Sequence, residues 1–150
     1  MGAGDPATCL KTATGLLARR EHSVKELKLK LRSRAFGDGM IDDVIAHLQG
    51  EGLICDERFV EMYLRSRAER GFGPVRLRRE LLDHGVDETL ITQYLAQFDW
   101  EALADKAWRK RFKGTVPDGI GERAKQTRFL QYRGFSIEQI RGLMGHDEWD

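Results

Sequence analysis

Hydrophobic residues recur three or four positions apart along most of the chain, and they seldom alternate with polar residues as they would in a β-strand. Such stripes run through residues 10–17, 24–31, 41–48 and 77–82, and shorter ones follow toward the C-terminus. Helices of about ten residues are not stable alone in water, so each needs to pack its hydrophobic face on a neighbour. The pattern therefore predicts an all-α protein made of small helical bundles.

Polar residues between the stripes supply start signals for these helices. Ser23 followed by Glu26, and Ser136 followed by Gln139, each have the spacing of a capping box, in which two side chains satisfy free backbone N–H groups. Further start signals stand at the heads of three other stripes: Asp56, Pro74 and Asp99. Glycines follow several stripes and mark the expected ends of helices.

The sequence resembles itself when it is shifted by about one third of its length. A shift of 49 residues places residues 81–95 on residues 130–144, across a helix, a turn and a helix. A shift of 50 residues aligns Leu31 with Leu81, after which residues 37–40 act as an insertion. Some self-similarity is expected in any helical protein with glycine turns. We nevertheless predict three tandem three-helix, helix-turn-helix-like repeats that stack into an elongated, curved molecule.

Glycine and proline content suggests where these repeats begin and end. Residues 114–121 combine three glycines with Pro117 and lack hydrophobic periodicity, which is typical of a linker. The predicted organisation is an N-terminal tail (1–11), a first repeat (12–70), a second repeat (71–113), the linker (114–121) and a short or partial third repeat with an acidic tail (122–150).

Charge changes this picture because it is segregated although its total is small. The formal net charge is +1, yet residues 19–34 carry seven cations and two carboxylates, residues 65–79 six and one, and residues 106–113 five and none. Residues 83–105 carry six carboxylates and no Lys or Arg. This alternation predicts one surface for a polyanion and another for a basic partner. The alternative is that these are solvated helix faces whose charges pair between neighbouring helices.

No pattern indicates catalysis, a metal or a cofactor. The four histidines are scattered and expected at the surface or at helix ends, and no glycine-rich phosphate loop is present. Cys9 and Cys55 form no CxxC pair and come without a secretory leader, so we expect free thiols and a cytoplasmic protein. No stretch reaches the ~20 hydrophobic residues of a membrane helix, and no membrane association is expected.

Several motifs resemble the RecX family. The strongest is Leu53 to Phe59 (LICDERF), which continues through Tyr63 to Gly71, Gly73 and Pro74. Arg128-Phe129-Leu130 with Arg133-Gly134-Phe135-Ser136, and Ser23 with Glu26-Leu27, add to the resemblance, which covers residues 12–144. Cys55 departs from the Asn or Asp expected before Asp56 and Glu57, which concerns only a local turn or cap.

The resemblance implies a regulatory protein without enzymatic activity. It implies an all-α monomer that lodges in the groove of the RecA–single-stranded-DNA filament and mainly inhibits the recombinase, ATPase and co-protease activities of RecA. DNA repair, recombination and the SOS response would be affected, and weak direct contact with DNA is also implied. The candidate residues for binding RecA or DNA are the cations Lys25, Lys28, Lys30, Arg32, Arg65, Arg67, Arg70, Arg76, Arg78, Arg79, Lys106, Arg109, Lys110, Arg111, Lys113, Arg128 and Arg133.

Two other functions are consistent with the same pattern. A direct DNA-binding regulator of helix-turn-helix type would place one helix in the major groove, although the near-neutral total charge and the lack of an evident dimerisation helix count against it. A helical scaffold is the other alternative, and its activity would not depend on the cations between Arg65 and Arg79. For a filament modulator, several weak contacts on one stiff molecule would reinforce one another along successive protomers.

Overall fold

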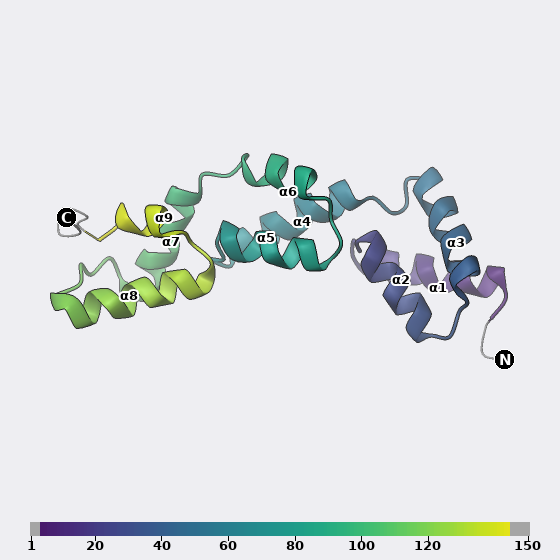
Figure 1. The fold of residues 1–150 in the computed structure, drawn as a ribbon, viewed down its shortest axis with the longest axis horizontal. Helices are drawn as coiled ribbons and strands as arrows, with labels where there is room; N and C mark the ends of the chain where they lie inside the picture. Colours follow the sequence, from purple (N-terminus) through teal and green to yellow (C-terminus); the bar gives the residue numbers. More distant parts are fainter. Residues whose placement is uncertain (1–3, 145–150) are drawn as a thin grey trace. The chain divides into compact units, whose positions relative to one another are not determined.

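The computed structural model describes residues 4–144, and this part of the chain is entirely helical outside turns and loops (Figure 1). The predicted all-α fold is confirmed. The helices are α1 (Pro6–Arg19), α2 (Val24–Ser33), α3 (Asp38–Gly50), α4 (Asp56–Glu69), α5 (Pro74–Asp83), α6 (Glu88–Leu95), α7 (Trp100–Phe112), α8 (Gly119–Arg133) and α9 (Ile137–Arg141).

Most of the predicted start signals act as expected. Ser136 and Gln139 form the complete capping box of α9, and the Asp99 side chain accepts the N–H of Ala102 at 3.1 Å at the start of α7. Ser23 caps α2 by accepting the N–H of Glu26 at 3.1 Å. The carboxylate of Glu26 bonds to Arg20, since an oppositely charged partner stands close to it.

Asp56 differs from the prediction that it caps its own helix. It is the first residue of α4, and its carboxylate accepts the N–H of Val24, the first residue of α2, at 2.8 Å. The N–H groups of a first helical turn have no partner within their own helix, so an acid from a neighbouring helix can satisfy one as well as a preceding residue can. Asp56 thus ties α4 to α2.

The contacts of the chain divide it into two compact units. Unit 1 contains Met1–Met62 and Leu81–Leu90, and unit 2 contains Tyr63–Glu80 and Ile91–Asp150. The division passes within α4, α5 and α6, so each of these helices contributes to both units. The elongated, curved shape of the whole molecule stays a prediction.

The core of unit 1 lies between α1, α2 and α3. Leu27 and Leu31 of α2 and Leu48 of α3 are fully buried, and they meet Cys9 and Ala13 of α1. All except Cys9, which falls in the predicted N-terminal tail, come from the hydrophobic stripes, so the helical periodicity of the sequence predicted most of this core.

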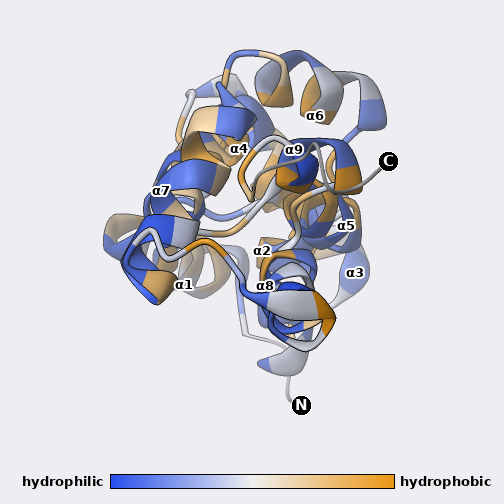
Figure 2. Cartoon of the chain, turned by 90° about the vertical axis from the view of Figure 1, so that its left-hand side faces the viewer, coloured by the Kyte–Doolittle hydropathy of each residue, from blue (hydrophilic) through white to orange (hydrophobic). Residues whose placement is uncertain are grey.

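The core of unit 2 lies between α7, α8 and α9. Trp108 of α7 is 3% exposed, and its indole N–H donates to the buried Gln126 of α8 at 2.7 Å. The amide of Gln126 donates in turn to the carbonyl oxygen of Thr115, at 3.0 Å, in the segment between the two helices. Single helices such as α7 and α8 carry both hydrophilic and hydrophobic residues (Figure 2), as amphipathic helices do.

Candidate anion-binding site

Unit 2 contains a cleft with a volume of about 380 Å³ whose walls are the end of α4, the outer face of α7 and the end of α8. Leu103, Ala107 and Phe129 give it a hydrophobic floor, and Glu69 is its acidic residue. The other charged groups are cations that the sequence analysis proposed for binding: Arg70, Lys106, Lys110, Arg111 and Arg133. Residues from three separate stretches of sequence therefore meet at one site.

Helical geometry explains why α7 contributes so many cations. Lys106 and Lys110 are four residues apart, so their side chains lie on the same face of the helix, and Arg111 follows directly. All three are exposed. Within residues 4–144, neither lysine makes a hydrogen bond or an ion pair, and neither does the Arg70 side chain. The cleft thus holds several positive charges without a carboxylate partner.

The guanidinium group of Arg133 is held in place at the edge of this cleft. It donates to the carbonyl oxygen of Arg70 at 3.0 Å, and its central carbon lies 5.0 Å from the ring centroids of both Phe72 and Phe129. Arg111 lies 5.6 Å from the Phe129 centroid. Arginine over an aromatic face is a favourable cation–π contact at these distances. These rings were absent from the candidate residues taken from the sequence, which considered charge alone.

Two glycines bring α5 and α8 together beside the cleft. Gly73 donates its N–H to the carbonyl oxygen of Arg133 at 2.7 Å, and Val75 donates to that of Gly134 at 2.9 Å. A Cβ at Gly73 would lie 2.5 Å from the carbonyl carbon of Gly134, closer than atoms can approach. Gly134 itself has φ of 104°, a left-handed conformation that favours glycine. The sequence analysis placed both glycines at helix ends and did not predict their contact.

Glu80 pairs with two further cations of the second basic segment. It accepts the hydroxyl of Tyr63 at 2.6 Å and the Nε–H of Arg76 at 2.9 Å, and Arg67 lies 3.9 Å away. Burial, together with the hydrogen bond and charge of Glu80, raises the pKa of Tyr63 to about 12. Burial also raises the pKa of Glu80, but its bonds to Tyr63 and Arg76 outweigh burial, so the net pKa lies below its ordinary value. Arg67 and Arg76 are therefore paired.

The four candidate cations of the first basic segment also have partners, and all of these partners belong to unit 1. The partners are a carboxylate of α2 itself, two carboxylates of α3 and a backbone carbonyl at the end of α5. The contacts are Lys25 Nζ with the Asp83 carbonyl oxygen (3.2 Å), Lys28 with Asp42 (3.4 Å), Lys30 with Glu26 (3.8 Å) and Arg32 with Asp38 (3.0 Å). These four cations are therefore engaged with groups of unit 1.

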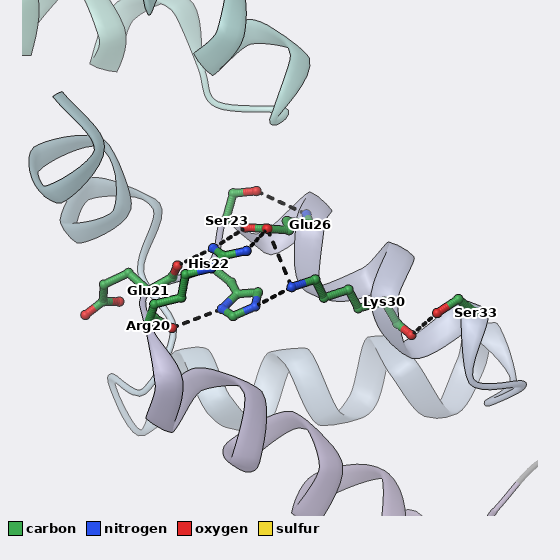
Figure 3. A network of polar contacts seen from close by, with 7 residues as sticks. All are labelled: Arg20, Glu21, His22, Ser23, Glu26, Lys30 and Ser33. Atoms are coloured by element: carbon green, nitrogen blue, oxygen red, sulfur yellow. Dashed lines mark hydrogen bonds and ion pairs between the residues drawn. The ribbon is translucent and has the colours of Figure 1, made fainter. Parts of the chain in front are cut away.

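His22 lies within the same part of unit 1 and is 1% exposed (Figure 3). Its Nδ1 is 3.0 Å from the carbonyl oxygen of Arg20, and its Nε2 is 3.0 Å from Nζ of Lys30. Because an ammonium group can only donate, Nε2 accepts and Nδ1 carries the proton. Burial lowers the pKa of His22, and the charges of Arg20 and Lys30 lower it further. His22 stands at a helix end as expected, but it is buried.

The other candidate cations lie away from the cleft. Arg78 donates to Thr92 at 3.3 Å, and Arg109 pairs with Asp105 at 2.8 Å. Lys113 caps α7 in the left-handed conformation, and Arg79 lies beside the exposed Tyr132 in a second hollow. Arg65 and Arg128 are exposed on α4 and α8.

Residues 4–144 bring together no group of three His, Cys, Asp or Glu side chains that could hold a metal ion. No helix in the described part of the chain has the length and hydrophobicity needed to cross a membrane.

Comparison with protein families matches three domain models along the chain. They are the first three-helix domain of RecX at residues 9–48, the second at residues 56–95 and the third at residues 99–144. The chain belongs to the RecX family. The resemblance inferred from the sequence is therefore confirmed, as are three tandem three-helix domains. They comprise α1–α3, α4–α6 and α7–α9.

Individual relatives agree with the family match. The chain is 43% identical to the regulatory protein RecX of Pseudomonas entomophila (strain L48), over 97% of this chain and 96% of the relative. It is 42% identical to the regulatory protein RecX of Pseudomonas fluorescens (strain SBW25), over 93% and 92%. The crystal structure of RecX from Lactobacillus salivarius has the same fold, with a TM-score of 0.78 at 21% identity and coverage of 97% of both chains. These relatives support a regulatory role.

The matched domain ranges do not coincide with the boundaries expected from glycine and proline content. The family ranges group α4 with α5 and α6, and they group α7 with α8 and α9 across residues 114–121. By the family's domain ranges, the cleft is lined by the end of α4 from the second domain and by α7 and α8 from the third domain.

Proposed function

We propose that the protein binds RecA and the RecA–single-stranded-DNA filament and mainly inhibits the recombinase, ATPase and co-protease activities of RecA. It would thereby limit DNA repair, recombination and the SOS response. The observation that carries the proposal, together with membership of the RecX family, is the cleft of unit 2 with its cations Arg70, Lys106, Lys110 and Arg111. A nucleoprotein filament offers phosphates and acidic side chains at regular intervals.

Electrostatics favours this cleft over the other basic segments as the binding surface. Cations that already pair with carboxylates lose those pairs when they bind an outside anion, so little net free energy is gained. Lys106 and Lys110 have no such pairs to lose among the described residues, and their mutual repulsion is relieved by an anion. Arginines add bidentate contacts to phosphate or carboxylate groups.

In this proposal the protein acts by binding and not by catalysis. We place it in the cytoplasm as a monomer, where RecA filaments assemble on single-stranded DNA. One cleft makes a modest contact on its own, and further weak contacts along the same chain would strengthen it through effective concentration.

The test adds the purified protein to preassembled RecA filaments on single-stranded DNA and follows ATP hydrolysis and strand exchange. Both rates are expected to fall as protein is added, and inhibition should weaken with added salt because charged contacts are screened. Unchanged rates at stoichiometries well above one protein per filament turn would contradict the proposal.

A direct DNA-binding regulator is distinguished by its sequence preference. Such a protein binds its own duplex about 4 to 10 kcal/mol more tightly than unrelated DNA. A filament modulator should bind unrelated duplexes with similar affinities. If the protein were such a regulator, competition among duplexes from a genomic pool would show a strong preference for one sequence.

A further inference from the structure

Unit 2 contains a ladder in which guanidinium groups and aromatic rings alternate. Each guanidinium carbon lies 4.4 to 5.6 Å from the centroid of each ring beside it, within the range of a cation–π contact. In order, the groups of the ladder are Arg111, Phe129, Arg133, Phe72, Arg76 and Tyr132. It begins in the basic cleft and ends at the second hollow.

The inner part of the ladder is rigid. Arg133 donates to the carbonyl oxygen of Arg70 at 3.0 Å, and Arg76 donates to Glu80 at 2.9 Å. These bonds hold both guanidinium planes against the ring of Phe72 between them. A surface whose planar groups are already fixed loses little conformational entropy when a ligand stacks on it.

The end of the ladder is open to solvent. Tyr132 is 76% exposed, a large fraction for an aromatic residue on a helix that packs in a core. It borders a hollow of about 410 Å³ that also contains Val75 and Arg79. The Arg79 side chain makes no ion pair with any residue in the described part of the chain. An exposed ring and a free cation therefore stand side by side.

We infer that the ladder and its flanking cations bind single-stranded nucleic acid. Phosphates contact Arg70, Lys106 and Lys110 at the cleft and Arg79 at the far end, and an unstacked base lies on the ring of Tyr132. The inference rests on the proposed function and deepens it, because it assigns the nucleic-acid strand of the filament to this surface. Grooves that combine cations with exposed aromatic faces are typical of sequence-independent binding to single strands.

The chemistry of the ladder separates a single strand from other anions. An acidic polypeptide would use the cations, but its carboxylate side chains have no planar ring to place on Tyr132, whereas every nucleotide of a strand carries a base. A duplex offers phosphates, yet its bases are stacked on one another and reach an exposed ring only after unpairing. A single strand satisfies both halves of the surface.

The test measures fluorescence anisotropy of the full-length protein with labelled oligomers, in the absence of RecA. One oligomer is oligothymidylate of about 20 nucleotides, and the other is an abasic oligomer with the same number of phosphates. Tyr132→Ala is expected to weaken oligothymidylate binding about tenfold, the scale of one lost base–aromatic stack. Tyr132→Phe should retain wild-type affinity, and the affinity for the abasic oligomer should not change.

A matched control comes from the same helix. Ile120 of α8 is 89% exposed and takes no part in the ladder, so Ile120→Ala should bind both oligomers as the wild type does. Equal affinity of Tyr132→Ala and the wild type for oligothymidylate would overturn the inference. So would equal wild-type binding of the abasic oligomer, or full competition by polyglutamate of equal charge.

Failure of this inference and failure of the proposed function are distinguishable. If Tyr132→Ala binds oligothymidylate normally while the wild type still inhibits ATP hydrolysis by RecA, the strand assignment is wrong and the regulatory proposal stands. If the wild type binds single strands but leaves ATP hydrolysis unchanged, the proposed function is wrong.

Discussion

The first basic segment and the cleft of unit 2 look alike in sequence and differ in the folded chain. The first basic segment carries a net charge of +5, and in the cleft five cations stand against one acid; each includes two cations four residues apart on one helix. In unit 1, Lys28 and Arg32 face Asp42 and Asp38 of the adjacent α3. In unit 2, Lys106 and Lys110 face a cleft in which Glu69 is the acidic residue. Net charge alone therefore does not identify a binding surface.

The difference teaches that the position of nearby acids decides whether a cation is available. On α7, Asp105 lies one turn before Arg109 and pairs with it, and Lys106 and Lys110 on the cleft side have no partner among the described residues. On α3, Asp42 and Asp38 stand opposite Lys28 and Arg32 of α2. Cations without partners in the folded chain are the ones that gain most from an outside anion.

The largest expected effect comes from reversing the charge of the cleft. The double substitution Lys106→Glu and Lys110→Glu should weaken binding to preassembled filaments about 100-fold, because it removes two phosphate contacts and adds repulsion. The slope of affinity against salt should fall by about two. Anisotropy of labelled filaments over a salt series measures both quantities.

The matched reversal in unit 1 sharpens the comparison. Lys28→Glu and Arg32→Glu change the net charge by the same amount on exposed positions of α2. Filament affinity should change less than about threefold, since these cations are engaged with α3. If the α2 reversal weakened binding as much as the cleft reversal did, net charge and not the cleft would govern binding.

A smaller effect is expected from the glycines that pack helices against each other in each unit. Gly73→Ala places a Cβ against the backbone of Gly134 and should lower the free energy of unfolding by about 2 kcal/mol. A Cβ at Gly85 in unit 1 would lie 2.7 Å from the Cβ of Lys25, which is fixed to α2, and φ at Gly85 is 78°, so Gly85→Ala should also cost about 2 kcal/mol. Urea denaturation measures both values.

Filament affinity tells the two glycine variants apart. Gly73→Ala moves α5 relative to the end of α8 and should distort the cleft, so binding should weaken beyond the loss of stability. Gly85→Ala should bind filaments as the wild type does at a temperature where both variants are folded. If only Gly85→Ala weakened filament binding, the binding surface would belong to unit 1 and not to unit 2.

The smallest expected effect is a pH dependence of stability that arises from His22 in unit 1. Burial and the charges of Arg20 and Lys30 lower the pKa of His22, whereas its hydrogen bond to the Arg20 carbonyl oxygen and the charge of Glu26 raise it, and the net pKa is lowered. The unfolded chain therefore takes up this proton first, so stability is complete above pH about 6.5 and falls as the pH drops below it. The loss should be about 1 kcal/mol or less.

Urea denaturation at pH 7.5 and 5.5 measures this loss, and His22→Gln should remove it because glutamine does not titrate. The lowered pKa of Glu26 acts only below its ordinary pKa of 4.5, outside this range. A wild-type stability that rose between pH 7.5 and 5.5 would contradict the geometry around His22.

The elements of the fold were predictable because their signals are local. Asp99, Pro74 and the Ser136 capping box act within one turn of their own helices. Asp56 was not predictable in the same way, because it bonds to Val24, which is 32 residues away. The burial of His22 likewise depends on Lys30 and on helices that enclose it.

The candidate site was predictable only in part. The segment 106–113 holds five cations and no acid, and it supplies three cations of the cleft. Pairing across helices, which removes the first segment from the site, depends on tertiary structure. The rings of Phe72, Phe129 and Tyr132 lack a sequence signal that separates them from core residues, so the ladder emerged only from the folded chain.

The most direct test of the central claim is photo-crosslinking inside the filament. A benzophenone amino acid replaces Lys110 in one variant and Lys28 in another, and each is bound to RecA filaments on single-stranded DNA. The account predicts crosslinks to filament components from position 110 and essentially none from position 28. Crosslinks from position 28 alone would contradict it.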